Sequence, residues 1–319
     1  MRRLRAGVIG VGYLGSFHAQ KYQQIDGVEL AAIADNNSSR LSEVSQRLGV
    51  PGFSEYPKLL GQVDLVSIVV PPAKHYEIGA FFLQNRVHCL IEKPLAEHVL
   101  HAQHLIEIAN NNNLILQVGH LERFNPMAAA LKQNVTDAIK INTLRNSIFK
   151  ERGTEVDVVL DSMIHDVDFI LDFERSKLVK VEARGVSLKS DAIDTAQATL
   201  FFESGLEAYL EADRVSDSAK RQIIIETSGY RYSIDFLTHK ASIEQKSGRM
   251  KNTSKLVEKN SETPFSFNQL PEKIDILKDE IINFTDAIKF GGLPLVSGED
   301  GKRALEVCLE IMDKIHSVD

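Results

Sequence analysis

Two segments of the sequence carry side chains that could exchange a proton with a substrate. Glu92-Lys93-Pro94 places a lysine directly after a strand-like run, and an ammonium group can donate to a substrate oxygen or, when desolvated, relay a proton. Asp161 and His165 lie four residues apart in a segment of helical periodicity, so one helix face would carry both. A carboxylate can orient such an imidazole as a general base. Lys93, Asp161 and His165 are therefore the candidate catalytic residues.

Each segment also has a purely structural explanation. A lysine after a strand is more often a solvated surface residue, and a polar stripe on an amphipathic helix is usually its exposed side. Thr154 and Asp157 have the spacing of a helix capping box, which explains Asp157 without any chemistry. Pro94 would pin Lys93 in a tight turn, and a cis peptide bond is one way to build that turn. The residues alone leave both explanations open.

The N-terminal region carries a motif for binding dinucleotide phosphates. Gly10, Gly12 and Gly15 form G-x-G-x-x-G between a strand-like run and a helix-like segment, and Asp35 closes the next strand-like run, over 28–34. The glycines allow a tight turn, a close approach to a pyrophosphate and close helix–strand packing, while the helix N-terminus faces the phosphates. An acid about 20 residues further on suits a ribose 2′-hydroxyl. This order of elements predicts an NAD-binding unit.

Asp35 also bears on the choice of cofactor. A carboxylate at this position would repel the 2′-phosphate of NADP, which favours NAD. The first basic residue after it is Arg40, which could still accommodate a 2′-phosphate. NAD is therefore the expected cofactor, with NADP as the alternative.

Composition excludes several classes of protein. The 319 residues are 43% hydrophobic and 25% charged, an ordinary globular composition with enough chain for two domains. A net charge of −7 gives no footprint for nucleic acid, and no segment approaches the ~18 apolar residues of a membrane span. Cys89 and Cys308 are expected as buried free thiols in a reducing, cytoplasmic compartment. His98, His101 and His104 lack a completed ligand shell, so no metal is expected.

The pattern of elements predicts two domains. Over 1–120, strand-like runs alternate with helix-like segments, which predicts a doubly wound Rossmann domain with a parallel sheet. Over 121–319, a helix precedes longer runs of alternating polarity, which predicts an α+β domain with a largely antiparallel sheet. The expected strands are 6–11, 28–34, 63–70, 87–91, 114–118, 178–188, 195–202, 206–212, 222–227 and 230–237; the expected helices are 16–23, 76–85, 99–109, 156–173, 273–290 and 300–316, and 246–267 is an expected loop.

Together these motifs resemble the glucose–fructose oxidoreductase/inositol dehydrogenase family (Gfo/Idh/MocA) over essentially the whole chain. The resembling segments are Gly10-x-Gly12-x-x-Gly15-x-x-His18, Asp35, Val70-Pro71-Pro72-x-x-His75, Glu92-Lys93-Pro94, Asp161-x-x-x-His165 and Gly298-Glu299-Asp300-Gly301. The resemblance implies that Lys93 and His165 flank the reacting carbon, with Asp161 beside them. It also implies an open second sheet whose exposed face joins subunits into a homodimer or homotetramer. The implied cofactor contacts are Gly10, Gly12, Tyr13, Leu14, Asp35, Pro71, His75, Glu92 and Lys93.

Two further runs resemble a branch of this family that oxidises C3 of UDP-N-acetyl sugars. They are 118–126, with the sequence VGHLERFNP, and 163–168, with the sequence MIHDVD. The resemblance implies NAD-dependent oxidation of a sugar hydroxyl to a ketone, in lipopolysaccharide biosynthesis. The implied substrate contacts are Lys93, Arg123, Asn125, Asp161 and His165, although Arg123 and Asn125 could instead hold the turn between the domains. The alternatives are a dehydrogenase of a free polyol or monosaccharide and a non-catalytic NAD-binding regulator.

A nucleotide-sugar substrate would also need a basic group for its diphosphate. Arg214, Lys220 and Arg221 lie between two expected strands. Arginine and lysine both bind phosphate oxygens, arginine through a planar fork and lysine as a point charge. A solvated hairpin turn explains the same three residues equally simply.

Overall fold

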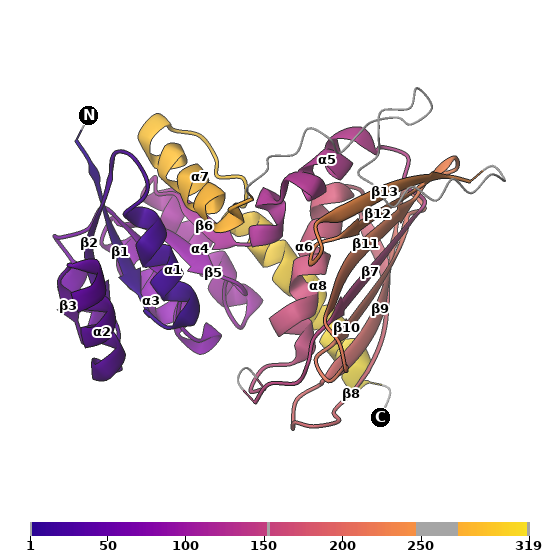
Figure 1. Cartoon of the computed structure of the whole chain (residues 1–319), viewed down its shortest axis with the longest axis horizontal. Helices are drawn as coiled ribbons and strands as arrows, with labels where there is room; N and C mark the ends of the chain where they lie inside the picture. Colours follow the sequence, from indigo (N-terminus) through magenta and orange to yellow (C-terminus); the bar gives the residue numbers. More distant parts are fainter. Residues whose placement is uncertain (1, 152–153, 247–273, 318–319) are drawn as a thin grey trace. The chain divides into compact units, whose positions relative to one another are not determined.

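The computed structural model describes residues 2–151, 154–246 and 274–317, and these residues form two units (Figure 1). The first unit consists of Met1–Phe124 and Asp275–Leu305, and the second of Asn125–Ile274 and Glu306–Asp319. The segment 275–305, which follows the second sheet in the sequence, therefore belongs to the unit that carries the glycine motif. Each unit has its own sheet, and each is described separately below.

The first unit contains a six-stranded parallel sheet in the order β3-β2-β1-β4-β5-β6. β1 pairs with both β2 and β4, so the strand order reverses beside β1. Ligands of doubly wound sheets bind beyond the carboxyl ends of the strands at such a reversal. The expected parallel Rossmann sheet is thus confirmed. Its strands are β1 (Leu4–Ile9), β2 (Val28–Ala34), β3 (Gly52–Phe53), β4 (Leu65–Ile68), β5 (His88–Glu92) and β6 (Leu116–Gly119).

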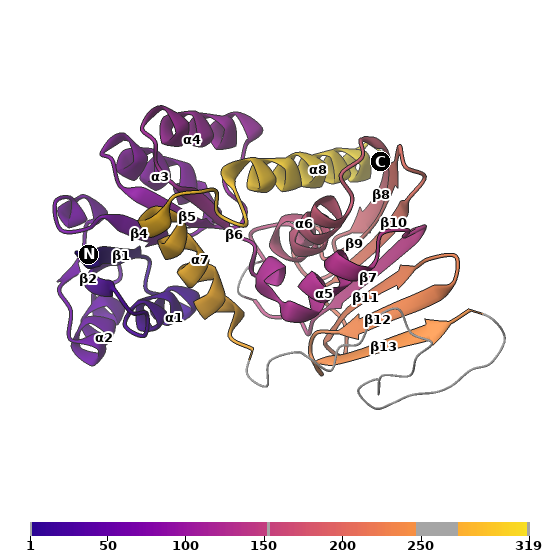
Figure 2. The same cartoon turned by 90° about the horizontal axis from the view of Figure 1, so that it is seen from above.

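Helices cover both faces of this sheet. Figure 2 shows α3 and α4 on one face and α1, α2 and α7 on the other. On the second face, Tyr22, Ile281 and Phe284 are fully buried in a shared hydrophobic core. α2 was not expected, because Leu41 and Val44 are its only buried residues and give a weak helical pattern. The helices are α1 (Tyr13–Tyr22), α2 (Ser38–Leu48), α3 (His75–Gln84), α4 (Val99–Asn111) and α7 (Ile276–Phe290), with short 3₁₀ turns η1 (Tyr56–Leu59), η2 (Pro72–Lys74) and η3 (Leu121–Phe124).

The second unit contains a seven-stranded sheet in the order β13-β12-β11-β7-β10-β9-β8. Only β7 and β10 pair in parallel, which confirms the expected, largely antiparallel sheet. Its central strand β7 was not predicted, because two of its three buried positions are polar, Thr143 and Arg145. The strands are β7 (Lys140–Asn146), β8 (Leu178–Val186), β9 (Thr195–Phe202), β10 (Glu207–Asp213), β11 (Lys220–Glu226), β12 (Tyr230–Asp235) and β13 (Lys240–Gln245).

Helices lie against one face of this sheet, as Figures 1 and 2 show for α5 and α6. α5 spans Pro126–Asn134, and α6 spans Ile164–Phe173 after a π-helical turn, η4, over Val159–Met163. The last helix, α8, spans Gly298–His316, and the division between the units passes within it. Of the expected loop, residues 247–267 lie outside the described part of the chain. Within the described residues, no helix combines the length and apolarity needed to cross a membrane.

Candidate active site

The glycine-rich loop lies between β1 and α1. Gly10 has a φ of +82°, and a Cβ there would lie 2.2 Å from the carbonyl oxygen of Val69. A Cβ on Gly15 would lie 1.8 Å from the carbonyl oxygen of Gly10, so both glycines are required by the packing of the loop itself. A Cβ on Gly12 would meet only Arg40 Nη1, at 3.5 Å. The open space over Gly12 fits a backbone that must approach a cofactor pyrophosphate closely.

Asp35 ties the end of β2 to this loop. Its Oδ2 accepts a hydrogen bond from the Val11 backbone N–H at 2.8 Å, and its Oδ1 accepts one from the Asn37 N–H at 2.8 Å. Each carboxylate oxygen has a second lone pair, so ribose hydroxyls can still donate to it. Arg40, the alternative 2′-phosphate ligand, reaches back toward Gly12. The glycines and Asp35 thus fit NAD, with a cation close to the phosphate end of the site.

We expect Asp35 to favour NAD over NADP, and its replacement to narrow that preference. Asp35→Asn keeps an acceptor oxygen and removes the charge, whereas Asp35→Ser also shortens the side chain. Relief of the repulsion between the carboxylate and a 2′-phosphate should strengthen NADP binding and so lower the preference for NAD over NADP by about tenfold or more. Titration of both cofactors against the wild type and both variants measures this preference. Equal or tighter binding of NADP by the wild type would contradict the assignment.

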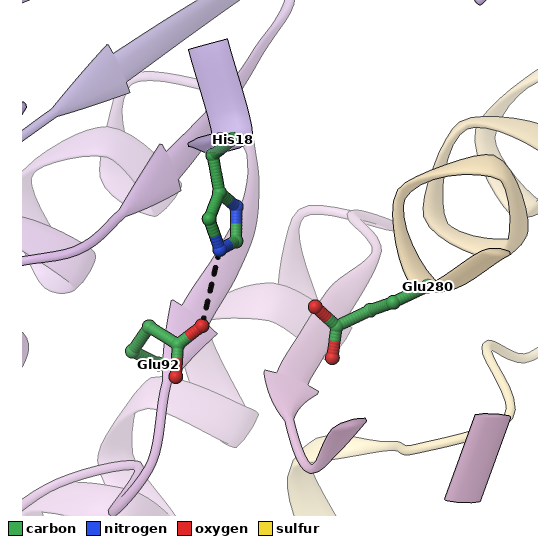
Figure 3. Close-up of side chains that lie close together, drawn as sticks. All are labelled: His18, Glu92 and Glu280. Atoms are coloured by element: carbon green, nitrogen blue, oxygen red, sulfur yellow. Dashed lines mark hydrogen bonds and ion pairs between the residues drawn. The ribbon is translucent and has the colours of Figure 1, made fainter. Parts of the chain in front are cut away.

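The Glu92-Lys93-Pro94 turn follows β5, and the bond between Lys93 and Pro94 is cis. The Glu92 carboxylate is buried and accepts hydrogen bonds from His18 Nε2 at 3.2 Å and from the Lys93 backbone N–H at 3.3 Å (Figure 3). The ring of His75 lies between the carbonyl oxygens of Pro94, 2.7 Å from Nδ1, and Val70, 2.9 Å from Nε2. These contacts fix the turn that presents the half-buried Lys93.

Glu92 and His75 were expected as direct cofactor contacts, and the structure shows partners for both within the protein, while their contacts with a cofactor remain a prediction. Their side chains are 6% and 0% exposed, and their polar atoms bind other parts of the first unit. Burial raises the pKa of Glu92, but hydrogen bonding to His18 and the nearby charges outweigh it, so the pKa lies below its usual value. Burial lowers the pKa of His75, against the opposing effect of its contacts with the Pro94 and Val70 carbonyl oxygens. Both side chains therefore help to hold the Glu92-Lys93-Pro94 turn.

The other expected cofactor residues lie around the same loop. Tyr13 begins α1, is 70% exposed and packs the edge of its ring against Phe17. Leu14 is half-buried in the first turn of the same helix. Pro71 directly precedes η2 beyond the end of β4. The nucleotide-binding motif thus brings these residues to the carboxyl edge of the first sheet, and their contacts with a cofactor remain a prediction.

In the second unit, the segment that carries Asp161 and His165 is not a continuous α-helix. Asp161 lies in the π-helical turn η4, and His165 lies in the first turn of α6. The expectation of one α-helix over 156–173 is therefore wrong at its N-terminal end. A π turn holds more residues than an α turn, so a spacing of four does not by itself stack the two side chains. Both are half-buried, and π turns inside helices are frequent at functional sites.

A buried ion pair fixes α6 to the centre of the second sheet. Arg145 of β7 donates from Nε to Asp166 Oδ2 at 2.9 Å and from Nη2 to Oδ1 at 2.7 Å. Two parallel charge-assisted hydrogen bonds hold both distance and orientation. Asp166 directly follows His165, so this pair locates the candidate base. The pair was missed because β7 itself was not predicted.

Asp157 does not cap a helix as its spacing with Thr154 predicted. Its Oδ1 accepts a hydrogen bond from the Ile193 backbone N–H at 2.7 Å, and the Thr154 hydroxyl donates to the Glu151 carbonyl at 2.9 Å. The capping-box interpretation is therefore wrong. Asp157 instead joins the start of the π turn to a distant loop of the same unit.

Arg123 and Asn125 have structural roles of the kind left open by the sequence. Arg123 is buried and pairs through Nη1 with Asp300 Oδ1, 3.2 Å away, within the first unit. Asn125 begins α5, and its side-chain oxygen accepts from the Met127 backbone N–H at 3.0 Å. These contacts account for both residues without a substrate, and their binding to a sugar remains a prediction.

Arg214, one of the three basic residues considered for a diphosphate, binds groups of the second unit itself. Its side chain is buried, and Nε donates to Asp194 Oδ1 at 2.8 Å. Asp194 also accepts backbone hydrogen bonds from residues 188–190. The guanidinium is thus committed to a turn inside the second unit. Lys220 and Arg221 lie exposed at the start of β11.

Comparisons with known proteins identify the family. A profile described as "Oxidoreductase family, NAD-binding Rossmann fold" (GFO_IDH_MocA) matches residues 4–120. Over 313 residues, the chain is 34% identical to UDP-N-acetylglucosamine 3-dehydrogenase of Acidithiobacillus ferrooxidans, covering 98% of this chain and 97% of that protein. It is 29% identical to myo-inositol 2-dehydrogenase of Thermotoga maritima, covering 95% and 93% of the two chains.

Solved structures agree with this. The structure of UDP-N-acetylglucosamine 3-dehydrogenase GnnA from Acidithiobacillus ferrooxidans matches with a TM-score of 0.88 at 33% identity, covering 99% of both chains. A scyllo-inositol dehydrogenase from Lactobacillus casei, solved with NAD(H) and scyllo-inositol, shares the fold with a TM-score of 0.77 at 20% identity. The chain belongs to the Gfo/Idh/MocA family of NAD-binding oxidoreductases.

Proposed function

We propose that this protein oxidises the C3 hydroxyl of a UDP-N-acetyl sugar to a ketone, with NAD as the hydride acceptor. The observation that supports this most strongly is the 34% identity to a UDP-N-acetylglucosamine 3-dehydrogenase over 98% of the chain. The ketone would suit an aminotransferase as the next enzyme, which is the lipopolysaccharide role expected from the sequence. A cytoplasmic location is part of the same proposal.

In this proposal, Lys93 and His165 serve a single proton and hydride transfer. His165 accepts the proton of the sugar hydroxyl, and Asp161 orients and biases the imidazole. Lys93 donates a hydrogen bond to the same oxygen and stabilises negative charge that develops on it. When bound, NAD supplies nicotinamide C4 as the acceptor of the hydride that leaves the sugar carbon. The O–H and C–H bonds break, and the C=O bond forms.

A second candidate is a dehydrogenase of a free polyol or monosaccharide. It is favoured by the 29% identity to a myo-inositol 2-dehydrogenase over 95% of this chain. A non-catalytic NAD-binding regulator is disfavoured, because Lys93, Asp161 and His165 are all present. The two enzymatic alternatives differ in whether the nucleotide contributes to recognition.

We therefore expect NAD reduction with UDP-N-acetylglucosamine to be at least about 100-fold more efficient than with free N-acetylglucosamine. This factor corresponds to roughly two charge-assisted hydrogen bonds to a diphosphate. The measurement is kcat/KM from NADH formation, with UDP-glucose and myo-inositol as controls for the acetamido group and for a ring polyol. Comparable efficiency on the free sugar would leave the polyol or monosaccharide dehydrogenase as the better description.

We further propose that the protein forms a homodimer or homotetramer through the outer face of the second sheet. On β8, β9 and β10 this face carries exposed and half-exposed polar side chains joined in a ladder: Arg184 donates to Gln197 at 2.6 Å, and Gln197 donates to Glu211 at 2.9 Å. A shallow pocket of about 240 Å³ lies among them. A polar ladder of this kind is suited to a second copy of the sheet, and sedimentation analysis of the purified protein tests it.

A further inference from the structure

A buried polar cluster lies in the core of the first unit, formed by His18, Glu92 and Glu280 (Figure 3). They come from α1, β5 and α7, and none is more than 6% exposed. One chain of contacts leads away from it: His18 Nδ1 is 3.3 Å from Ser67 Oγ, which is 2.8 Å from the Tyr22 hydroxyl. With Tyr22, Ser67 and His18 each donating to the next group, this chain ends on the Glu92 carboxylate.

Glu280 approaches the cluster from the opposite side. Figure 3 shows its carboxyl group directed toward His18 and Glu92. One ligand atom from each of the three residues lies within 4.8 Å of the others. Both Glu280 oxygens are buried, and neither has a hydrogen-bond partner among the described residues. An ionised carboxylate in such a place would be strongly destabilising, so the group needs a proton or a cation.

The two carboxyl groups have different surroundings. Glu92 accepts two hydrogen bonds, and its pKa is lowered by His18 and the nearby charges against the effect of burial. Burial raises the pKa of Glu280 well above its usual value, and the charge on Glu92 raises it further. Two close carboxyl groups of this kind ionise as a pair, with one holding the proton. Here the proton belongs on Glu280.

We propose that Glu280 is a neutral acid whose O–H is hydrogen-bonded to the Glu92 carboxylate, directly or through one water molecule, and that it positions the Glu92-Lys93-Pro94 turn. A water that bonds to both oxygens at ~2.8 Å would span ~4.5 Å, and the ligand atoms of the cluster lie within 4.8 Å of one another, which leaves either form of the contact open. Gly119 makes room for this contact, because a Cβ there would lie 2.8 Å from the Glu92 carboxyl carbon.

The connection to Lys93 is short. Glu92 Oε2 accepts the Lys93 backbone N–H, so the orientation of the Glu92 carboxylate affects the start of the turn. The Glu92 carboxylate already accepts hydrogen bonds from His18 and from the Lys93 N–H, and the O–H of Glu280 would be its third donor. Glu280 is thus a positioning residue, and its expected effect on turnover rests on the proposed role of Lys93. Its protonation does not rest on that role.

A divalent cation is the competing occupant of the cluster. One imidazole and two carboxylates can bind such ions. With a proton on Glu280, the two carboxyl groups carry a single negative charge, on Glu92, and the positive charge of Lys93 lies near it. Elemental analysis of the purified enzyme, after dialysis with and without a chelator, separates the two occupants.

The first test is the pH dependence of stability. Because the pKa of Glu280 is raised in the folded state, its contribution is present at low pH and is lost as the pH rises through the folded value. At pH values between the pKa of Glu280 in the unfolded chain and its higher pKa in the folded protein, the folded protein holds one more proton than the unfolded chain. The unfolding constant therefore rises by about tenfold per pH unit in this range. Glu280→Gln keeps the shape and an N–H donor, so it should remove this slope and gain stability over the wild type as the pH increases.

Other ionisable groups near α7 must be the same in both proteins for this comparison. α1 and η3 pack against α7, and their ionisable groups include His18, Lys21, Tyr22, Glu122 and Arg123. The cluster itself adds Glu92, Lys93 and His75. The contributions of all of them except Glu92, which ionises together with Glu280, cancel in the difference between wild type and variant. Thr285→Val is a matched control, because Thr285 is equally buried on α7 and donates to its own helix, to Ile282 O at 3.0 Å.

The second test separates positioning from general stability. Glu280→Gln should keep kcat within about threefold of the wild type, whereas Glu280→Leu, which has no donor, should lower kcat by about tenfold or more with a smaller change in KM. The infrared C=O band of a protonated carboxylic acid should be present in the wild type at pH 7 and absent from Glu280→Gln.

Three results would overturn the proposal. They are a bound metal near one equivalent per chain, a wild-type stability slope equal to that of Glu280→Gln, or no infrared band lost in that variant. A lost band and slope with unchanged kcat in Glu280→Leu would confirm the neutral acid and reject its positioning role. Loss of activity in Lys93 variants is measured separately, so failure of the proposed function is distinguishable from failure of this inference.

Discussion

Replacing Lys93 or His165 by alanine is expected to lower turnover by about 100-fold or more while cofactor affinity changes little. General acid–base groups contribute factors of about 10² to 10⁴, and each of these residues is proposed to act on the hydroxyl that loses its proton. Lys93 lies in a turn fixed by Glu92 and His75, and His165 precedes the aspartate held by Arg145. Removing either side chain therefore removes its chemistry and leaves those supporting contacts in place.

The measurement combines single-turnover kinetics with cofactor titration. The chain contains no tryptophan, so NADH fluorescence reports cofactor binding without an indole background. Lys74→Ala serves as a control, because Lys74 belongs to the same unit and its ammonium group forms an exposed ion pair with Glu77. A Lys93 or His165 variant that keeps near-full turnover, under conditions where chemistry limits the rate, would exclude that residue as the proton carrier.

The fold could be predicted from the sequence wherever one face or both faces of a strand are apolar. β2 and β9 have the bounds expected from their patterns, 28–34 and 195–202. The central strand β7 could not be found in this way, because Thr143 and Arg145 occupy positions where the pattern needs apolar residues. Arg145 is tolerated there only because Asp166, from a helix 21 residues further on, neutralises it. Such a pairing is not visible until both elements are placed.

The candidate site divides in the same way. The glycine motif and Asp35 are local in sequence, so their spacing predicted the loop and its position after β1 correctly. The buried roles of His75 and Glu92 come from partners such as Pro94 and His18, which the chain brings together only in three dimensions. Glu280 gave no signal at all, because one acid on an amphipathic helix normally faces solvent. Its burial is set by the return of 275–305 to the first unit.

Alanine substitutions in the glycine motif are also expected to have large effects. Gly15→Ala should lower the stability of the fold, whereas Gly12→Ala should weaken cofactor binding. At Gly15 the new methyl group would lie 1.8 Å from the Gly10 carbonyl oxygen, so backbone must move and the melting temperature should fall by about 5–10 °C. At Gly12 the backbone has φ −64° and ψ −160°, which alanine can adopt, and the nearest atom is Arg40 Nη1 at 3.5 Å. Gly12→Ala should therefore fold normally.

The defect of Gly12→Ala should appear only when the cofactor binds. A methyl group there occupies the space that the pyrophosphate needs, and an overpacking cost of about 1–3 kcal/mol corresponds to a roughly 10- to 100-fold weaker affinity for NAD. Thermal melts without cofactor, paired with NADH titrations, distinguish the two variants, and Gly229→Ala is the control because nothing lies within 4 Å of its added Cβ. Wild-type NAD affinity in a folded Gly12→Ala protein would show that the pyrophosphate does not pass over this residue, and the cofactor would have to be placed elsewhere on the loop.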